Sequence, residues 1–336
     1  MTTSPLILVP FDDSDPAARA FDHALALSRR HGADVHLVHA VPARERPHEH
    51  SRLRAALIER VRRRAAAARV PLTLSVRHGE PAEVIRLYAQ VLSPDLIVMG
   101  THQRTGLERL RAGSVAERVM LDATQPVLIV PSRAPEAAPF ERIAVGIDFD
   151  HVSPRAVSLA TDLAGRDHGQ VTVVHAVPRV GGRRSAARGR DEGLGEYLDR
   201  LSQDELTEHA WRRLERVMPK RMQETAGLDV RVVEGAPATA ITGVADDIGA
   251  DLIVVGVPQR GSVVRAVFGV TAARLLRQAS VPVLAVPDCT ADQPKSSLFA
   301  RHEPATDSVW EPFGSQVPWL GEEEAGDHRA KPTVVH

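Results

Sequence analysis

The chain has 336 residues, of which 43% are hydrophobic and 25% are charged, and its formal net charge is −1. These values exclude fibrous, collagen-like and wholly disordered proteins. No apolar run approaches the roughly 20 residues that a membrane helix needs, so we expect no membrane span. The first ten residues do not resemble a signal peptide, so we expect none. The one cysteine, Cys289, cannot form an internal disulfide, which favours a reducing, cytoplasmic location.

The first part of the chain alternates between predicted strands and predicted helices. We expect strands at 5–11, 34–41, 72–78, 95–99 and 126–130, and helices at 16–30, 51–69, 81–92 and 114–122. Several strands are nearly continuous runs of Val, Ile and Leu, which is typical of parallel strands covered on both faces. This alternation indicates right-handed βαβ units and an open α/β sheet. The default ligand site is then the crevice at the carboxyl ends of the strands.

The second part of the chain repeats the first. DVHLVHAVP at 34–42 matches QVTVVHAVP 136 residues later, and DLIVMG at 95–100 matches DLIVVG 156 residues later. The different offsets indicate a basic insertion of about 20 residues in the second copy. The predicted divisions are domain 1 (1–133), a linker (134–139), domain 2 (140–287, with the insertion at about 179–198) and a tail (288–336).

The tail is acidic and rich in proline. It carries nine acidic and four basic residues and shows no helical or strand periodicity. We expect it to be disordered. Because it also contains Trp310 and Trp319, two hypotheses stay open: the tail docks on the basic insertion, or it is an unstructured extension.

A glycine-rich segment follows the fourth predicted strand. Gly100 ends that strand, where backbone can approach a ligand closely. Gly113 and Ser114 open a helix, whose free N–H groups favour an anion. Asp12, which ends the first strand, can hydrogen-bond the polar part of a nucleotide. An ordinary structural explanation stays open, because Ser114 and Glu117 also form a capping box.

Each repeat resembles a domain of the universal stress protein family, over about residues 1–287. The segments that carry the resemblance are ILVPFDDS, LVHAV, PDLIVMGTHQRTGLERLRAGSVAERVM and QPVLIVP. The nucleotide-binding branch of the family has the pattern G-x2-G-x9-G-[ST], and Gly100, Gly113 and Ser114 match it with the right spacing. Gln103 stands in place of the middle glycine.

The resemblance implies a fold and a ligand for each repeat. The fold is an open five-stranded parallel sheet in the order 3-2-1-4-5 with helices on both faces, and the ligand is ATP, with or without Mg²⁺. The nucleotide positions in the first repeat would be Asp12, Val41, Met99, Gly100, His102, Gln103, Arg104, Gly113, Ser114 and Val115. Those in the second would be Asp148, Val177, Val255, Gly256 and Gly269. The resemblance also implies pairing through the last strands (126–130 and 282–286), within the chain or in a homodimer.

The departures from the family pattern favour the first repeat as the nucleotide site. The glutamine at position 103 disfavours positive φ, but its amide and the guanidinium of Arg104 can donate hydrogen bonds to a phosphate. The second repeat has Gln259 at the same place and Val270 instead of the hydroxyl residue, with Thr271 as a substitute cap one residue later. We predict a stress-response regulatory module that binds ATP or a related adenine nucleotide mainly in domain 1. The alternative is an interaction scaffold that binds no nucleotide.

The sequence contains no motif that identifies a catalytic residue. It contains no P-loop, no G-x-G-x-x-G after a strand and no nucleophile elbow, so we expect at most slow ATP hydrolysis. His39 and His175 are interpreted as packing residues of the second strand in each repeat, and no metal site is expected. The arginines between 44 and 69 fit a solvated helix face, and 4% aromatic residues leave little for base stacking. Nucleic acid is therefore not expected as a partner.

Overall fold

The computed structural model describes residues 4–41, 51–101, 115–149, 153–164, 169–179, 202–217, 227–257 and 265–287. The predicted insertion (apart from Arg179) and the tail lie outside these ranges. Within the described ranges, no helix is long and apolar enough to cross a membrane.

The first repeat alternates strand and helix, and each predicted strand lies within two residues of its observed bounds. Its elements are β1 (Leu6–Pro10), α1 (Asp15–His31), β2 (Asp34–Val41), α2 (Ser51–Ala68), β3 (Leu72–His78), α3 (Pro81–Leu92), β4 (Leu96–Thr101), α4 (Val115–Asp122) and β5 (Val127–Pro131). Prolines stand near the starts of α1 and α3, where a missing N–H costs nothing.

The second repeat follows the same plan. Its elements are β6 (Arg142–Ile147), α5 (Ser153–Ala164), β7 (Gln170–Val177), α7 (Gln203–Val217), β8 (Leu228–Glu234), α9 (Pro237–Ile248), β9 (Leu252–Val257), α10 (Arg265–Gln278) and β10 (Val283–Pro287). The linker between the repeats runs from β5 to β6.

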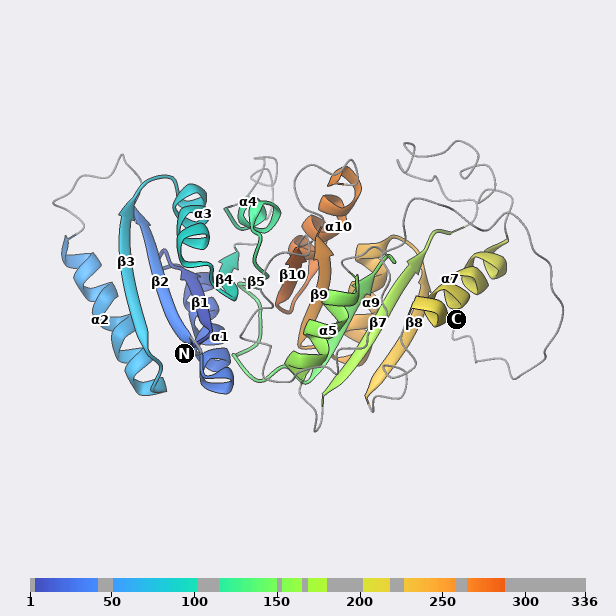
Figure 1. Cartoon of the computed structure of the whole chain (residues 1–336), viewed down its shortest axis with the longest axis horizontal. Coiled ribbons are helices and arrows are strands. Elements are labelled where there is room, and N and C mark those ends of the chain that lie inside the picture. Colours follow the sequence, from blue (N-terminus) through green and yellow to red (C-terminus); the bar gives the residue numbers. More distant parts are fainter. Residues whose placement is uncertain are drawn as a thin grey trace. The chain divides into compact units, whose positions relative to one another are not determined.

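The described strands form one ten-stranded sheet in the order β3-β2-β1-β4-β5-β10-β9-β6-β7-β8. Each half has the predicted order 3-2-1-4-5, and its strands are parallel. We predicted two repeated sheets with pairing through the last strands, and in this structure β5 and β10 pair antiparallel, so that the two halves form one sheet. Figure 1 shows these two strands at the centre and β3 and β8 at the outer edges.

The ladder between β5 and β10 is self-complementary. Leu128 lies opposite Leu284, its own equivalent in the second repeat, and Val127 and Ile129 lie opposite Ala285 and Val283. A twofold relation between the repeats at Leu128 and Leu284 produces this register. This is how two identical subunits meet in an isologous interface.

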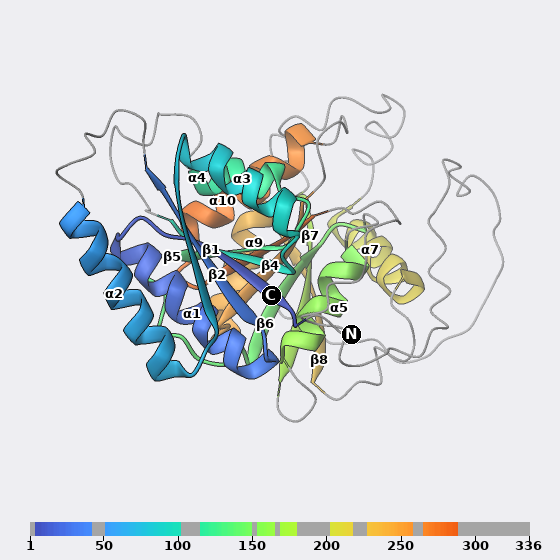
Figure 2. The ribbon, with the colours of Figure 1, turned by 60° about the vertical axis from the view of Figure 1, so that its left-hand side comes forward.

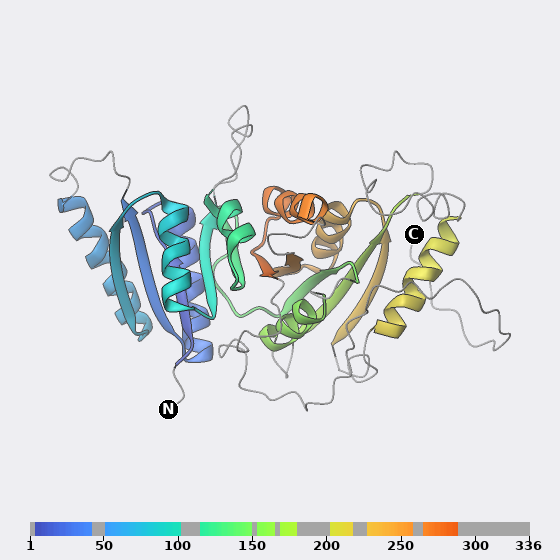
Figure 3. The same cartoon turned by 45° about the horizontal axis from the view of Figure 1, so that its top comes forward.

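Two hydrophobic cores cover the faces of the sheet, and each contains residues of both repeats. One core packs beneath α1, α2, α5 and α7, and the other beneath α3, α4, α9 and α10. Figure 2 shows α1, α2 and α5 on the opposite side of the sheet from α3, α4 and α10, and Figure 3 turns the second layer toward the reader. Strands covered on both faces explain the continuous apolar runs in the sequence.

An equivalent aspartate fastens the amino end of the sheet in each repeat. Asp95 Oδ2 accepts a hydrogen bond from the backbone N–H of Leu6 at 2.8 Å. Asp251 Oδ2 accepts from the N–H groups of Glu141 and Arg142 at 2.7 and 3.1 Å. Burial is the largest influence on Asp251 and raises its pKa, although its hydrogen bonds act in the opposite direction.

Candidate functional site

The turn after β1 in the first repeat is held by its own polar side chains. Asp12 Oδ1 accepts hydrogen bonds from the Ser14 N–H at 3.1 Å and from the Ser14 hydroxyl at 2.5 Å. Ser14 is the N-cap of α1, and its Oγ accepts from the Ala17 N–H at 3.3 Å. The sequence DDSDP therefore forms an ordered turn, and Asp12 is exposed at the carboxyl end of β1.

The next residue, Asp13, adopts a left-handed backbone conformation with φ of 65°. This conformation costs a non-glycine residue roughly 1–2 kcal/mol. The Asp13 carboxylate forms an ion pair with Arg60 of α2, and both side chains are about half exposed, at 46% and 53%. The ion pair fastens α2 to the turn at the crevice.

The end of β2 is bound to both of its neighbouring strands. His39 Nδ1 donates to the Phe11 carbonyl at 2.7 Å, because a carbonyl oxygen can only accept. The buried Val41 accepts a hydrogen bond at its carbonyl from the Gly79 N–H at 2.9 Å. His39 is therefore more than a packing residue, since it fixes the end of β1 one residue before Asp12.

The end of β4 carries the glycine that we expected to give a ligand room. A Cβ built on Gly100 lies 2.3 Å from the Pro16 carbonyl carbon and 2.6 Å from the Ala17 nitrogen. The missing side chain therefore allows the first turn of α1 to pack on β4. The Cβ side of Gly100 is therefore occupied by α1, and the role of Gly100 as a nucleotide position stays a prediction. Met99, its neighbour, is buried in the core under α3 and α4.

The predicted phosphate loop is not part of the described structure. His102, Gln103, Arg104, Gly113 and Ser114 lie outside the described residues, whereas Val115 is the first residue of α4. In the next turn of α4, Arg118 Nη1 forms an ion pair with Glu80 Oε1 at 3.0 Å. Glu80 is also the N-cap of α3, so this contact fixes α4 beside the start of α3.

The second repeat keeps the backbone of this site but changes its chemistry. Phe149 occupies the place of Asp13 and has the same φ of 65°. His175 repeats the bond of His39, with Nδ1 at 3.0 Å from the Ile147 carbonyl. The Phe149 ring lies 4.2 Å from the His175 ring, and the guanidinium of Arg213 lies over it at 4.7 Å. A cation–π contact thus replaces the ion pair of the first repeat.

Burial and two neighbouring groups shift the pKa of His175. Burial is the largest influence and lowers its pKa, the bond to the Ile147 carbonyl raises it, and the charge of Arg213 lowers it. The ring is therefore neutral at pH 7 and donates from Nδ1.

The remaining predicted positions of the second repeat are only partly alike. Asp148, Val177 and Gly256 stand at the ends of β6, β7 and β9, as their counterparts do in the first repeat. Gly269 lies inside α10, which begins at Arg265, rather than just before the helix. Thr271 therefore cannot cap the start of this helix, and that prediction was wrong.

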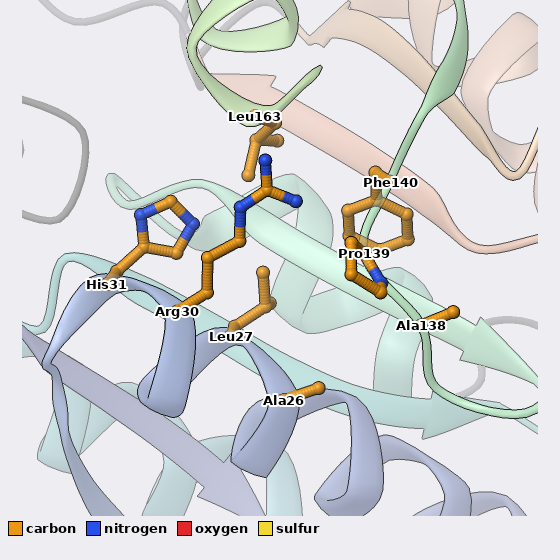
Figure 4. A pocket seen from close by; sticks show the side chains of 8 residues that line it. All are labelled: Ala26, Leu27, Arg30, His31, Ala138, Pro139, Phe140 and Leu163. Atoms are coloured by element: carbon orange, nitrogen blue, oxygen red, sulfur yellow. The ribbon is translucent and has the colours of Figure 1, made fainter. Parts of the chain in front are cut away.

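A small cavity lies at the other end of α1 from this crevice. It measures about 40 Å³ and is lined by Ala26, Leu27, Arg30, His31, Ala138, Pro139, Phe140 and Leu163 (Figure 4). This space is too small for a nucleotide, since ligand pockets measure roughly 300–1,000 Å³. Within the described ranges, no three His, Cys, Asp or Glu side chains gather in a way that could hold a metal ion.

A sequence model of the universal stress protein family matches residues 6–131 and again 139–287. The chain belongs to the universal stress protein family. A universal stress protein of Methanocaldococcus jannaschii is 36% identical over 136 residues, covering 37% of this chain and 80% of that protein. One from Thermus aquaticus is 37% identical over 132 residues, covering 37% of this chain and 96% of that protein.

A solved structure resembles nearly the whole described fold of this universal stress protein. The crystal structure of a universal stress protein from Archaeoglobus fulgidus has a TM-score of 0.62 and 19% sequence identity, and the match covers 84% of this chain and 96% of that one. At this identity the likeness concerns the fold. Both repeats of the chain thus belong to one family, and the fold agrees with that assignment.

Proposed function

We propose that the first repeat binds an adenine nucleotide, ATP above all, at the carboxyl ends of β1, β2 and β4. The observation that carries this proposal is the divergence of the chain around β1. This strand pairs with β2 on one side and β4 on the other, α1 packs in one layer, and α4 packs in the opposite layer. In open α/β sheets, ligands bind in the crevice that such a switch in strand order creates.

The residues around β1 fit the adenosine part of a nucleotide. Asp12 presents an exposed carboxylate whose Oδ1 is already held by Ser14, and an ionised carboxylate can accept further hydrogen bonds. In this proposal ribose hydroxyls donate to Asp12, and the adenosine lies against Val41 and Gly100. The phosphates, with or without Mg²⁺, would lie near the start of α4, with Gln103, Arg104 and Ser114 as their donors.

The proposal assigns one nucleotide to each chain. The second repeat carries the Phe149 ring where the first carries Asp13, and its glycine Gly269 lies within a helix. These differences support a nucleotide site in domain 1 and a second repeat that has lost it. In this proposal the protein is cytoplasmic, and its response depends on the concentration of cellular ATP.

Calorimetric titration of ATP and Mg²⁺ into the full chain tests the proposal. Asp12→Asn keeps an oxygen for Ser14 but removes the charge, and Asp148→Asn is the matched change in the second repeat. We expect a stoichiometry near one and a 10- to 100-fold weaker Kd in Asp12→Asn, because hydrogen bonds to charged groups contribute about 1.5–3 kcal/mol. Asp148→Asn should bind as the unchanged chain does. An equal loss in both variants would contradict the assignment.

The β5–β10 ladder favours a second candidate function, that of an assembly scaffold. In this alternative the pairing of the repeats through their last strands persists in solution or is exchanged between two chains as a homodimer, and no nucleotide is needed. Absence of heat and of thermal stabilisation at millimolar ATP would favour the scaffold. Light scattering then distinguishes a monomer with internal pairing from a homodimer.

A further inference from the structure

The linker between the two repeats is buried at both of its ends. Ala134, just after β5, is 2% exposed, and Phe140, just before β6, is 3% exposed. Pro135, Glu136, Ala138 and Pro139, which lie between them, are exposed. The linker is therefore anchored at two points and accessible to solvent in the middle.

One face of α1 makes these anchors. Arg19 Nη1 donates to the Ala134 carbonyl at 3.0 Å, and the backbone of Pro135 is close enough to the His23 ring to raise its pKa. The His23 and Phe140 rings stack nearly parallel, with centroids 6.0 Å apart and planes 8° apart. Positions four apart lie on one helix face, and Leu27 continues this face toward the cavity in Figure 4.

The His23 ring is placed so that it can be held only in its neutral form. It is 3% exposed, and its Nε2 is buried without a hydrogen-bond partner among the described residues. Protonation would place a charge and a second N–H donor in a site that offers no acceptor, which is costly unless the group reaches water.

Few charges act on this ring. On α1 itself these are Asp22, which forms an ion pair with Arg64 of α2, and Arg19. The linker side contributes the Pro135 carbonyl and the Phe140 ring. Burial is the largest influence and lowers the pKa of His23; the Pro135 carbonyl and Asp22 raise it, and Arg19 lowers it.

We propose that Arg19 and His23 of α1, together with residues 134–140, form a clasp that holds the linker closed at neutral pH and opens when the His23 ring takes up a proton. The driving force follows from linkage. Because the pKa is lowered in the closed state, the clasp is fully stable above the ordinary histidine pKa of about 6.5, and its stability falls as the pH falls below that value. This inference is independent of nucleotide binding.

Proteolysis of the full chain by a glutamyl endopeptidase tests the clasp, because Glu136 lies in the middle of the linker. The rate of cleavage after Glu136 is measured at pH 7.5 and pH 5.0, and each rate is divided by the rate on a model peptide. His23→Asn keeps a polar side chain at this position but cannot take up a proton. His78→Asn removes an exposed histidine at the end of β3 and is the matched control.

We expect the normalised rate in the unchanged chain and in His78→Asn to rise at pH 5.0, by up to about tenfold for each unit of pKa lowering. The rate in His23→Asn should be the same at both pH values, whatever its level, and this would support the clasp. A rise in His23→Asn equal to that of the unchanged chain, or no rise in the unchanged chain, would overturn it. Neither outcome bears on whether ATP binds.

Discussion

Substitution of Gly100 by alanine separates two explanations for this glycine. If its missing side chain serves a ligand, Gly100→Ala affects nucleotide binding and leaves the stability of the apo protein unchanged. If it serves the packing of α1 on β4, the same change destabilises the protein without any ligand. The structure favours the second explanation, because the added Cβ lies 2.3 Å from the Pro16 carbonyl carbon.

The magnitude follows from this distance. Ordinary contacts begin at 3.4 Å, so the first turn of α1 must move by about 1 Å, and the atoms in its way belong to backbone rather than to a flexible side chain. Insertion of a methyl group into packed structure costs about 1–3 kcal/mol, and we expect the upper end of this range. The turn at Asp12 and Ser14 should shift with the helix.

Gly243 of α9 provides the matched control. It is exposed, and a Cβ built on it has no atom within 4 Å. Gly243→Ala should therefore stabilise the protein by about 0.5–1 kcal/mol, since glycine disfavours helix interiors. Urea unfolding of the apo chain and both variants measures the effects. A Gly100→Ala variant as stable as the unchanged chain, but with weakened ATP binding, would refute the packing explanation.

Three further predictions concern other parts of the fold. Phe149→Ala should be about 1 kcal/mol less stable than Phe149→Gly in urea unfolding, because both lose the ring stack but only alanine keeps the left-handed strain. Leu128→Ala and Leu284→Ala should each cost about 2–5 kcal/mol, and a double-mutant cycle should show coupling, since the residues lie opposite each other. Asp251→Asn should flatten the pH dependence of stability. The pKa of Asp251 is raised, so its contribution is present at low pH and is lost as the pH rises through that value.

The positions of the strands followed from local patterns. The run DVHLVHAV at 34–41 coincides with β2, which is mostly buried. The segment LTLSVRH at 72–78 alternates apolar and polar residues and coincides with the edge strand β3. The strand order came from the family resemblance. The resemblance also implied pairing through the last strands, but the sequence left open whether they pair within the chain or between two chains, because both arrangements need the same apolar strand.

The local geometry of the site depends on contacts that single residues do not reveal. The packing of α1 against Gly100 could not be predicted from the sequence. Pro16, which a Cβ at Gly100 would contact, lies 84 positions earlier. The bond from His39 to Phe11 likewise joins residues 28 apart, although the repetition of HAV in both copies offered a signal. In α10 the helix begins at Arg265, four residues before Gly269, which the position of this glycine in the sequence did not indicate.

The two repeats keep the same backbone conformation at this site but carry different side chains on it. In both, a histidine of the second strand bonds the end of the first strand, and the following turn contains a left-handed, non-glycine residue. Such strain persists only when the surrounding structure compensates for it. In the first repeat Asp13 forms an ion pair with Arg60, and in the second Phe149 stacks on His175 and Arg213. Because both turns keep the same backbone, Phe149 can stand in place of Asp13 without loss of the fold, while Asp148 keeps the carboxylate that corresponds to Asp12. The proposal that only the first repeat binds a nucleotide therefore depends on Phe149 and Gly269, and not on loss of the crevice carboxylate.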